Sequence, residues 1–360
     1  MNRNLILAIN IFFLAACVSR DHEEKENFRT ITDAVGRKVQ VPEEIDKIIG
    51  LRPGTLRLIC YLNATEKVVA VEDNENRRTV PYLFAHPELK KLPVIGSGNN
   101  FEPELLASHQ PDVIFITYFS SGEADELQNK TGIPVIVLDY ANFMEKRKKL
   151  YETLGFLGEL LDKKSRADTL IHRINHFIED MHKRTQSLGK NTNVCTYVGG
   201  IAYHGSHGII STEPFYPPFR LIGATNVARK AFQSPQEEKV WPENAVIDIE
   251  MLINWDPDYI FLDVSGKALW QKDLQKEVLQ NSLVAIKNQE LYLVFPYNWY
   301  TTNYENILCN AYYIGKILYP EAFSDVSIRE KCNEIYTSFL KTPVFDKMNK
   351  EFRAFRKYHF

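Results

Sequence analysis

The sequence of 360 residues predicts an α/β fold of two Rossmann-like lobes with mainly parallel sheets, joined by one long α-helix. Short, nearly unbroken apolar segments alternate with helix-length segments, and they form two sets along the chain. A pattern of Glu, Pro and Asp that includes Glu104 recurs 146 residues later, around Glu250. An uninterrupted amphipathic stretch lies between the two sets. A chain of this length also favours two domains.

The amino terminus predicts export. Residues 1–16 combine one positive charge with an apolar stretch, and small residues stand before Cys17, so this is a secretory signal too short to span a bilayer. The ending Leu-Ala-Ala-Cys resembles the bacterial lipoprotein signal, which implies cleavage before Cys17 and a lipid on that residue. A plain signal peptide with an incidental cysteine is the alternative. Residues 17–27 are charged without apolar periodicity, which predicts a flexible tether.

Residues 28–160 are predicted to form the amino-terminal α/β lobe. They open with alternating apolar and polar residues around Gly36, which predicts an edge hairpin closed by Pro42. Four apolar segments follow, near residues 48, 68, 113 and 135. Strands that are apolar on both faces are typical of a parallel sheet covered by helices.

Residues 161–188 are predicted to be the linking helix. Apolar residues recur there at spacings of three and four, neither glycine nor proline interrupts them, and Gly189 offers a stop. Such a helix would be about 40 Å long and would restrict the relative movement of two lobes. Residues 189–360 are predicted to form the carboxy-terminal lobe, with strands near residues 194, 259 and 291.

Composition and motifs exclude several classes of function. A net charge of −3 gives no reason to expect nucleic acid as a partner. The sequence contains no nucleophile elbow, no phosphate loop and no complete dinucleotide fingerprint, so it predicts a binding protein without a cofactor rather than an enzyme. An exported hydrolase on the same scaffold is the rival from another class. The cysteines of the mature chain are predicted to be buried free thiols, although an exported setting permits one disulfide; they are Cys60, Cys195, Cys309 and Cys332.

The repeated pattern places one acidic residue on each lobe. In each copy the glutamate opens a short helix, Pro-Asp ends it and a buried strand follows. A helix packed on a parallel sheet begins at the carboxyl edge of the strands, so Glu104 and Glu250 are expected on the same rim. One such acid is explained by the helix dipole, which contributes a few tenths to about 1 kcal/mol. Two such glutamates at matched positions, one on each lobe, indicate a surface that contacts a partner with two-fold symmetry.

These features together resemble the iron-siderophore and cobalamin class of periplasmic binding proteins, over essentially the whole mature chain. The resemblance rests on the signal, the hairpin Asp-Ala-Val-Gly-Arg-Lys-Val-Gln-Val-Pro, both glutamate segments and the long helix. It implies a monomeric, lipid-anchored receptor of an ABC importer, in the periplasm or on the envelope surface; which membrane holds the lipid stays open. It also implies that Glu104 and Glu250 dock on arginines of a dimeric permease with a cytoplasmic ATPase, with Glu102 as a neighbour able to share the first role.

The solute is expected in a cleft between the lobes, lined by loops at the carboxyl ends of the strands. These loops are rich in aromatic residues, which suit a bulky and partly flat chelate, and Arg52 and Arg57 suit a negative charge. The resemblance implies that this chelate is a ferric siderophore, haem or cobalamin, and the choice among them stays open. The predicted cleft residues are Arg52, Arg57, Tyr118, Tyr203, His204, His207, Trp270, Tyr297, Trp299, Tyr300 and Tyr304.

His204 and His207 raise the question of a metal site. Two histidines three residues apart on a glycine-rich loop are able to ligate iron or a bare cation. The remaining residues of such a site are not visible in the sequence, so no metal ligand is assigned. A bare-cation receptor, with three or four convergent His, Asp or Glu ligands, is the rival among binding proteins.

Overall fold

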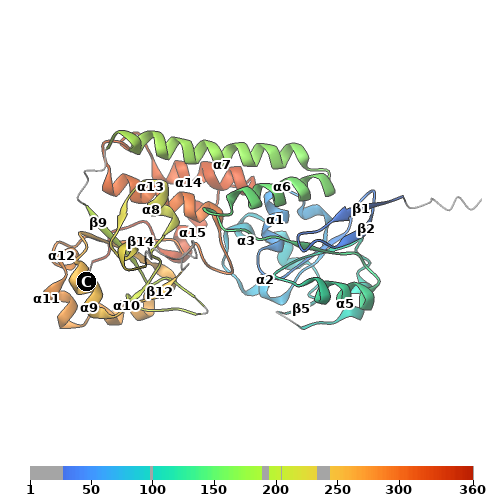
Figure 1. Cartoon of the computed structure of the whole chain (residues 1–360), viewed down its shortest axis with the longest axis horizontal. Helices are drawn as coiled ribbons and strands as arrows, with labels where there is room; N and C mark the ends of the chain where they lie inside the picture. Colours follow the sequence, from blue (N-terminus) through green and yellow to red (C-terminus); the bar gives the residue numbers. More distant parts are fainter. Residues whose placement is uncertain (1–26, 98–99, 189–193, 204, 233–243, 360) are drawn as a thin grey trace, which may run out of the picture.

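The chain folds into two α/β lobes that lie side by side, with one long helix running along both (Figure 1). This computed structural model describes residues 27–97, 100–188, 194–203, 205–232 and 244–359. The long helix is α7 (Lys164–Thr185), and the predicted fold class is confirmed. The predicted signal and most of the predicted tether lie outside the described residues.

The sheet of the amino-terminal lobe is parallel throughout. Its order is β4 (Val68–Ala70), β3 (Ile48–Leu51), β7 (Val113–Thr117) and β8 (Val135–Leu138), the four segments predicted from their apolar residues. Nearly every residue of these strands is buried, because helices cover both faces. The α-helices of this lobe are α1 (Thr55–Tyr61), α2 (Asp73–Arg77), α3 (Pro81–Ala85), α4 (Pro103–Ser108), α5 (Ser121–Thr131) and α6 (Arg147–Leu160).

The predicted hairpin forms from β1 (Phe28–Thr32) and β2 (Lys38–Pro42), an antiparallel pair. Gly36 has φ 82°, a backbone conformation that glycine adopts without strain. The hairpin is joined to β8 because the backbone N–H of Ala34 donates to the carbonyl of Val137 at 3.0 Å. It therefore covers the edge strand of the sheet. A second short hairpin pairs β5 (Gly96–Ser97) with β6 (Asn100–Phe101).

The sheet of the carboxy-terminal lobe repeats this arrangement. Its order is β11 (Thr225–Asn226), β9 (Cys195–Gly199), β13 (Tyr259–Asp263) and β14 (Leu291–Val294), all parallel. The remaining elements are the antiparallel pair β10 (Ser211–Thr212) and β12 (Ala245–Val246), and the helices α8 (Pro217–Leu221), α9 (Ile249–Trp255), α10 (Lys267–Asp273), α11 (Glu277–Ser282), α12 (Val284–Lys287), α13 (Tyr304–Leu318), α14 (Ile328–Leu340) and α15 (Phe345–Phe352).

The long helix is shorter than the predicted range 161–188. Asp162 has φ 55°, and this left-handed residue separates α7 from α6. Residues Gln186–Leu188 continue α7 as a 3₁₀ turn. At 1.5 Å per residue, 22 residues extend over about 33 Å. The four cysteines within the described residues are free thiols; Cys60, Cys309 and Cys332 are buried, as predicted, and Cys195 is half-buried.

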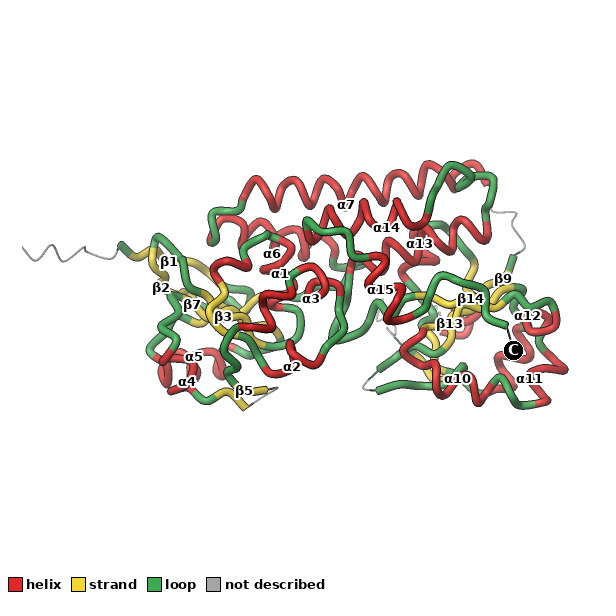
Figure 2. Tube along the Cα trace, turned by 180° about the vertical axis from the view of Figure 1, so that it is seen from behind, coloured by secondary structure: helices red, strands yellow, loops and turns green. Residues whose placement is uncertain are grey.

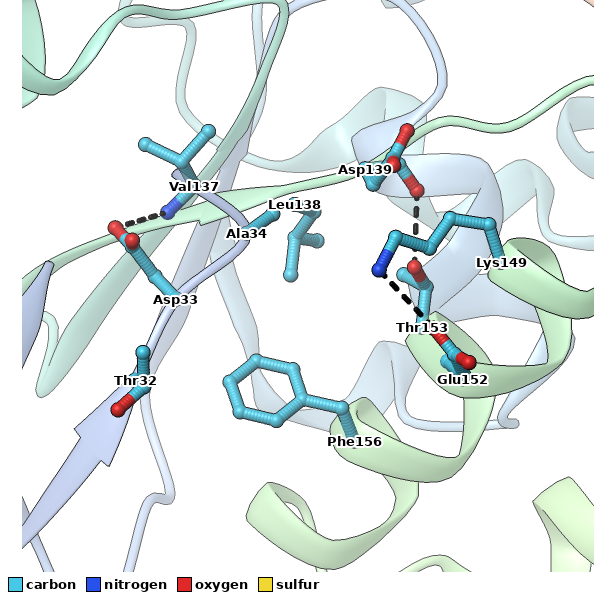
Figure 3. Close-up of a pocket in the computed structure, with 10 residues that line it drawn as sticks. All are labelled: Thr32, Asp33, Ala34, Val137, Leu138, Asp139, Lys149, Glu152, Thr153 and Phe156. Atoms are coloured by element: carbon cyan, nitrogen blue, oxygen red, sulfur yellow. Dashed lines mark hydrogen bonds and ion pairs between the residues drawn. The ribbon is translucent and has the colours of Figure 1, made fainter. Parts of the chain in front are cut away.

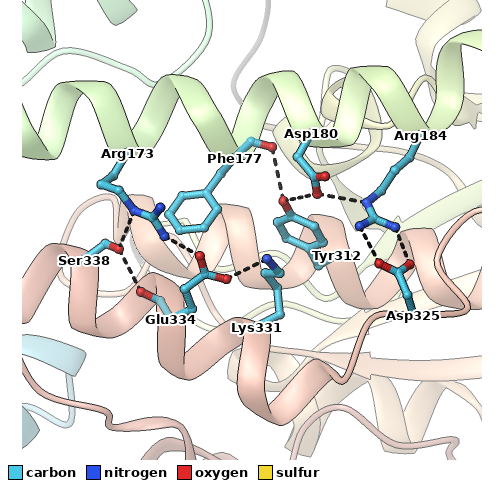
Figure 4. Close-up of polar contacts among 9 residues, drawn as sticks. All are labelled: Arg173, Phe177, Asp180, Arg184, Tyr312, Asp325, Lys331, Glu334 and Ser338. Carbon is cyan, nitrogen blue, oxygen red and sulfur yellow. Dashed lines mark hydrogen bonds and ion pairs between the residues drawn. The ribbon is translucent and has the colours of Figure 1, made fainter.

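Polar contacts fix α7 to the carboxy-terminal helices (Figure 4). Arg173 pairs with Glu334 of α14, and Arg184 donates two hydrogen bonds to Asp325 at 2.6 and 2.9 Å. The hydroxyl of Tyr312 on α13 donates to Asp180 at 2.7 Å. These bonds hold α7 against one lobe, while its other end packs on α6 of the other lobe (Figure 2). α7 is therefore a brace between the lobes.

Replacing Arg166 by Met is expected to lower the free energy of unfolding by about 2–4 kcal/mol. Its guanidinium donates to the carbonyls of Tyr61 at 2.8 Å and of Ser338 at 2.6 Å, so it ties α7 to the ends of α1 and α14. Without it these carbonyls lose their charged donor. Urea unfolding measures the difference. Lys130→Met, on an exposed helix face, is the control and should stay within about 0.5 kcal/mol of the wild type.

Candidate functional site

Loops of the amino-terminal lobe meet the chain that connects β14 to α13. Residues 297–303 of this connection are here called the bridging segment. The hydroxyl of Tyr118, directly after β7, lies 2.9 Å from Oγ1 of Thr301. Three backbone carbonyls of the segment, those of Tyr297, Trp299 and Thr301, accept hydrogen bonds from the Asn303 side chain. The loops that the sequence predicted to bind solute thus meet a segment held in a fixed shape.

Four residues at this contact have left-handed backbones. The φ angles are 71° at Arg52, 52° at Tyr118, 52° at Tyr300 and 57° at Thr301. None of them is glycine, so each conformation costs energy that neighbouring contacts must offset. Such residues are typical of binding and catalytic sites when they gather in adjacent loops. The backbone therefore indicates that this contact is functional.

Arg57 anchors the bridging segment from inside the amino-terminal lobe. It lies in α1, is fully buried, and donates to the carbonyls of Tyr300 at 2.8 Å and Thr302 at 3.0 Å. It also donates to the hydroxyl of Tyr140 at 2.7 Å, and that hydroxyl donates to Thr302 at 2.6 Å. Arg57 therefore positions the segment.

Two other arginines lie against aromatic faces at the site. The guanidinium carbon of Arg52 is 5.1 Å from the ring centre of Phe119, and that of Arg78 is 4.7 Å from the ring centre of Tyr300. Such cation–π contacts are attractive and hold each guanidinium against a ring. Together they give the site positive charge on aromatic walls, an arrangement suited to an anionic solute.

Two buried carboxyl groups lie beside these arginines. Glu72 and Glu75 are 1% and 2% exposed. Burial raises the pKa of Glu72 to about 8, and the charge of Glu75 adds to the rise. Burial also raises the pKa of Glu75, although the hydroxyl of Tyr82 donates to its carboxylate at 2.5 Å and opposes the rise. Glu72 is therefore mainly neutral near pH 7.

Buried polar atoms without a hydrogen-bond partner gather at this site. Six of the eleven such side-chain atoms in the described part of the chain lie here. Each is expected to cost about 1–3 kcal/mol unless a water or a ligand supplies the partner. The atoms at the site are Arg52 Nε, Arg57 Nε, Glu72 Oε1, Trp299 Nε1, Asn303 Oδ1 and Glu305 Oε1.

Three aromatic residues of the predicted cleft lie in the protein interior. Trp270 is fully buried, donates to the carbonyl of Asp263 at 2.9 Å and packs so closely on Gly200 that a Cβ there would be 2.6 Å from its ring. Tyr297 is buried and bonds Glu213, and fully buried Tyr304 donates to the carbonyl of Ala141. Each polar atom has a partner inside the protein, so these side chains pack in the core and present almost no surface to a solute.

Tyr203 and His207 lie on the loop after β9 of the other lobe. Tyr203 is 47% exposed, and its carbonyl lies 2.7 Å from Nε2 of His207. His204 lies outside the described residues. Among the residues with described positions, no three His, Cys, Asp or Glu side chains are placed to hold a metal ion.

Sequence reasoning missed three residues of the site, namely Glu72, Arg78 and Thr301. Glu72 follows β4 after a single residue, at the carboxyl end of a predicted strand, so the rule that selected Arg52 and Tyr118 also applies to it. Arg78 and Thr301 carry no such signal, because their positions depend on how the bridging segment packs.

The two matched glutamates lie on the side of the molecule away from α7. Glu104 and Glu250 are exposed in the first turns of α4 and α9, and Glu102 is exposed just before α4. Figure 1 shows α9 and Figure 2 shows α4 at the edge opposite α7. The strands that follow them, β7 and β13, each stand third in their sheet. The two acids therefore occupy equivalent positions in the two lobes.

A cavity of about 200 Å³ lies apart from this site, between the hairpin and α6 (Figure 3). Its polar groups are largely paired with one another. Asp33 accepts from the N–H of Val137, Lys149 donates to Glu152, and Thr153 donates to the carbonyl of Asp139. The cavity thus lacks the unpaired donors that distinguish the bridging segment and its neighbours.

Comparison with known proteins gives consistent matches. Residues 48–296 match the family model described as periplasmic binding protein. The molybdate-binding protein MolA of Haemophilus influenzae is 23% identical over 335 residues. The alignment covers 87% of this chain and 91% of the MolA chain. The petrobactin-binding protein YclQ of Bacillus subtilis is also 23% identical, and the alignment covers 72% of this chain and 78% of the YclQ chain. The solved structure of MolA bound to molybdate aligns with a TM-score of 0.67 at 22% identity, over 88% of this chain and 98% of that one, and so shows the same fold.

Proposed function

The chain belongs to the family of periplasmic binding proteins, and from this premise we propose that it is the receptor lipoprotein of an ABC importer. Proteins of this family are exported, bind small-molecule solutes and work with a permease and its ATPase. The observation that carries the proposal is the pair of equivalent exposed glutamates, Glu104 and Glu250, on one side of two braced lobes. They are proposed to seat the protein on a dimeric permease.

Anchoring is proposed through a lipid on Cys17, which lies outside the described residues. The signal-like residues 1–16 before it support this proposal. Within the described part of the chain, no helix is long and apolar enough to cross a membrane.

The proposed solute is an iron chelate, a ferric siderophore, or a related metal macrocycle such as haem or cobalamin, held between the lobes. Tyr118, Trp299 and Tyr300 offer rigid aromatic surface, and Arg52 and Arg78 offer positive charge. The similarity to a petrobactin-binding protein supports this choice.

A small oxyanion is the second candidate solute. The unpaired donors at the site favour it, because Arg52 Nε and Trp299 Nε1 are buried and suit compact oxygen acceptors. MolA, which is similar over most of both chains, is a molybdate-binding protein.

Binding assays on the purified protein distinguish these candidates. Ferric siderophores, haem, cobalamin and molybdate are each added, and tryptophan fluorescence and native mass spectrometry report binding. A receptor for dilute solutes needs a dissociation constant of about 1 µM or lower, which corresponds to about 8 kcal/mol. Tight binding of free Zn²⁺ or Mn²⁺ alone contradicts the chelate proposal, and turnover of a bound ester or phosphate contradicts the receptor proposal itself.

Replacing Trp299 by Ala is expected to weaken solute binding about 10- to 100-fold, because it removes an aromatic surface and a buried donor. Isothermal titration with the solute identified above measures the change. Trp255→Ala, which removes another half-buried tryptophan from α9, is the matched control and should leave affinity within about twofold of wild type. Equal affinity of Trp299→Ala and wild type removes Trp299 from the site.

A further inference from the structure

Glu72 lies at the wall of the candidate site with one carboxyl oxygen bound and the other unused. Its Oε2 accepts a hydrogen bond from the backbone N–H of Arg52 at 2.8 Å. Its Oε1 is buried and has no hydrogen-bond partner. A solvent-exposed oxygen would be satisfied by bulk water, but Glu72 is only 1% exposed. This oxygen therefore lacks the partner that a buried polar atom ordinarily has.

The groups that face Glu72 come from three parts of the chain. Arg52 faces it from the loop after β3, Glu75 from α2, and Tyr300 from the bridging segment. Arg57 and Arg78 act electrostatically on Glu75. One acidic neighbour and strong burial disfavour a negative charge on Glu72, and the bond from Arg52 does not outweigh them.

The hydrogen bond from Arg52 decides which oxygen carries the proton. Because Oε2 accepts from an N–H group, the proton of the neutral carboxyl resides on Oε1. Oε1 is then a buried donor without an acceptor, like Arg52 Nε and Trp299 Nε1. Three unpaired donors are complemented by a solute that presents several oxygen acceptors.

We propose that Glu72 contacts the solute as a neutral hydrogen-bond donor, so that the site selects an oxygen-rich anion. This inference rests on the proposed receptor function and names the chemistry of its solute. The anionic oxygens belong either to a compact oxyanion or to the chelating groups of an iron complex. Ionisation of Glu72 removes the donor and adds a negative charge beside the solute, so both effects weaken binding.

Because ionisation of Glu72 weakens binding, the affinity for the solute should fall as the pH rises. Glu72 is neutral below about pH 8 and loses its proton above it. Affinity should therefore be constant from about pH 6 to about pH 7.5 and then fall by up to about tenfold per pH unit. A bound anion favours the neutral form further, which moves the fall to somewhat higher pH.

The test uses isothermal titration of the full mature chain with molybdate and with ferric petrobactin from about pH 6 to about pH 10. Wild type should show the fall in affinity with at least one probe, and the probe that binds identifies the source of the anionic oxygens. Glu72→Gln keeps an acceptor for Arg52 and a permanent donor, so its affinity near pH 7 should stay within about threefold of wild type and should not fall at high pH. Glu126→Gln, an exposed glutamate of the same lobe, is the control and should keep the wild-type profile.

The outcomes separate this inference from the proposed function. A probe that binds wild type with the same affinity across the range overturns the contact with Glu72 and leaves the receptor function intact. If the affinity of Glu72→Gln also falls at high pH, the contact with Glu72 is likewise overturned and the receptor function stays intact. Failure of both probes to bind wild type overturns the inferred selection of an oxygen-rich anion through Glu72 and removes molybdate and ferric petrobactin as solutes, while the receptor function is then tested with haem and cobalamin. If Glu72→Gln does not fold, as shown by circular dichroism, the wild-type profile alone decides.

Discussion

Reversing the charge of both matched glutamates, Glu104→Arg with Glu250→Arg, is expected to abolish solute uptake while leaving solute affinity within about twofold of wild type. Both side chains are exposed, and the residues of the candidate site lie on other elements. The fold should therefore tolerate the change. A permease surface that presents arginines would meet two positive charges instead of two negative ones, and juxtaposed like charges cost several kcal/mol.

Two measurements on the same variant test this prediction. Uptake is followed in cells whose only copy of the gene carries the change, and affinity is measured on the purified protein. The matched control reverses two other exposed glutamates, Glu126 on α5 and Glu277 in the first turn of α11, which keeps the total charge equal. Uptake by the control should be near wild type. Uptake by the Glu104 and Glu250 variant at the wild-type rate would remove the docking role from both residues.

The fold could be predicted from the sequence because its determinants are local. Each of the seven predicted strands formed, since apolar runs such as residues 113–116 and 135–138 are buried on both faces wherever the helices pack. The spacing of apolar residues predicted α7 for the same reason. Its start was misplaced, because Asp162 adopts a left-handed backbone that the apolar pattern does not encode.

The candidate site could be predicted only in part. Arg52 and Tyr118 could be predicted as site residues because the carboxyl ends of parallel strands meet at one edge of the sheet. Trp270 was placed in the cleft from its loop position, but Gly200 leaves room for its ring in the core and Asp263 satisfies its N–H. Whether an aromatic residue in a loop faces solvent or core depends on such non-local partners.

The bridging segment adds to the connections between the lobes that α7 makes and that α14 makes by packing on α1 and α3. Its neighbour Tyr304 opens α13 and stacks on Tyr140 of the amino-terminal lobe, with ring centres 5.3 Å apart. α13 packs in turn on α14 and α7. A change in the position of the bridging segment is thus coupled to the packing of the brace, which limits how far the lobes rotate.

Replacing Arg57 by Met is expected to lower the free energy of unfolding by about 3–5 kcal/mol and to weaken solute binding as well. The guanidinium is fully buried and donates to Tyr140, Tyr300 and Thr302. Methionine fills much of the volume but leaves both carbonyls of the bridging segment without a charged donor. Loss of this anchor should loosen Tyr300 and the adjacent Trp299, which supply aromatic surface to the solute.

Urea unfolding and isothermal titration at a temperature where the variant is folded separate the two effects. Arg57→Lys keeps the charge but lacks the planar fork that reaches three acceptors, so it should recover only part of the stability. Arg77→Met, which removes an exposed arginine, is the control and should change neither quantity measurably. If Arg57→Met is less stable but binds solute as tightly as wild type, then Arg57 supports only the fold. Weakened binding in the folded variant, with stability partly restored by lysine, identifies Arg57 as the residue that positions the bridging segment for capture.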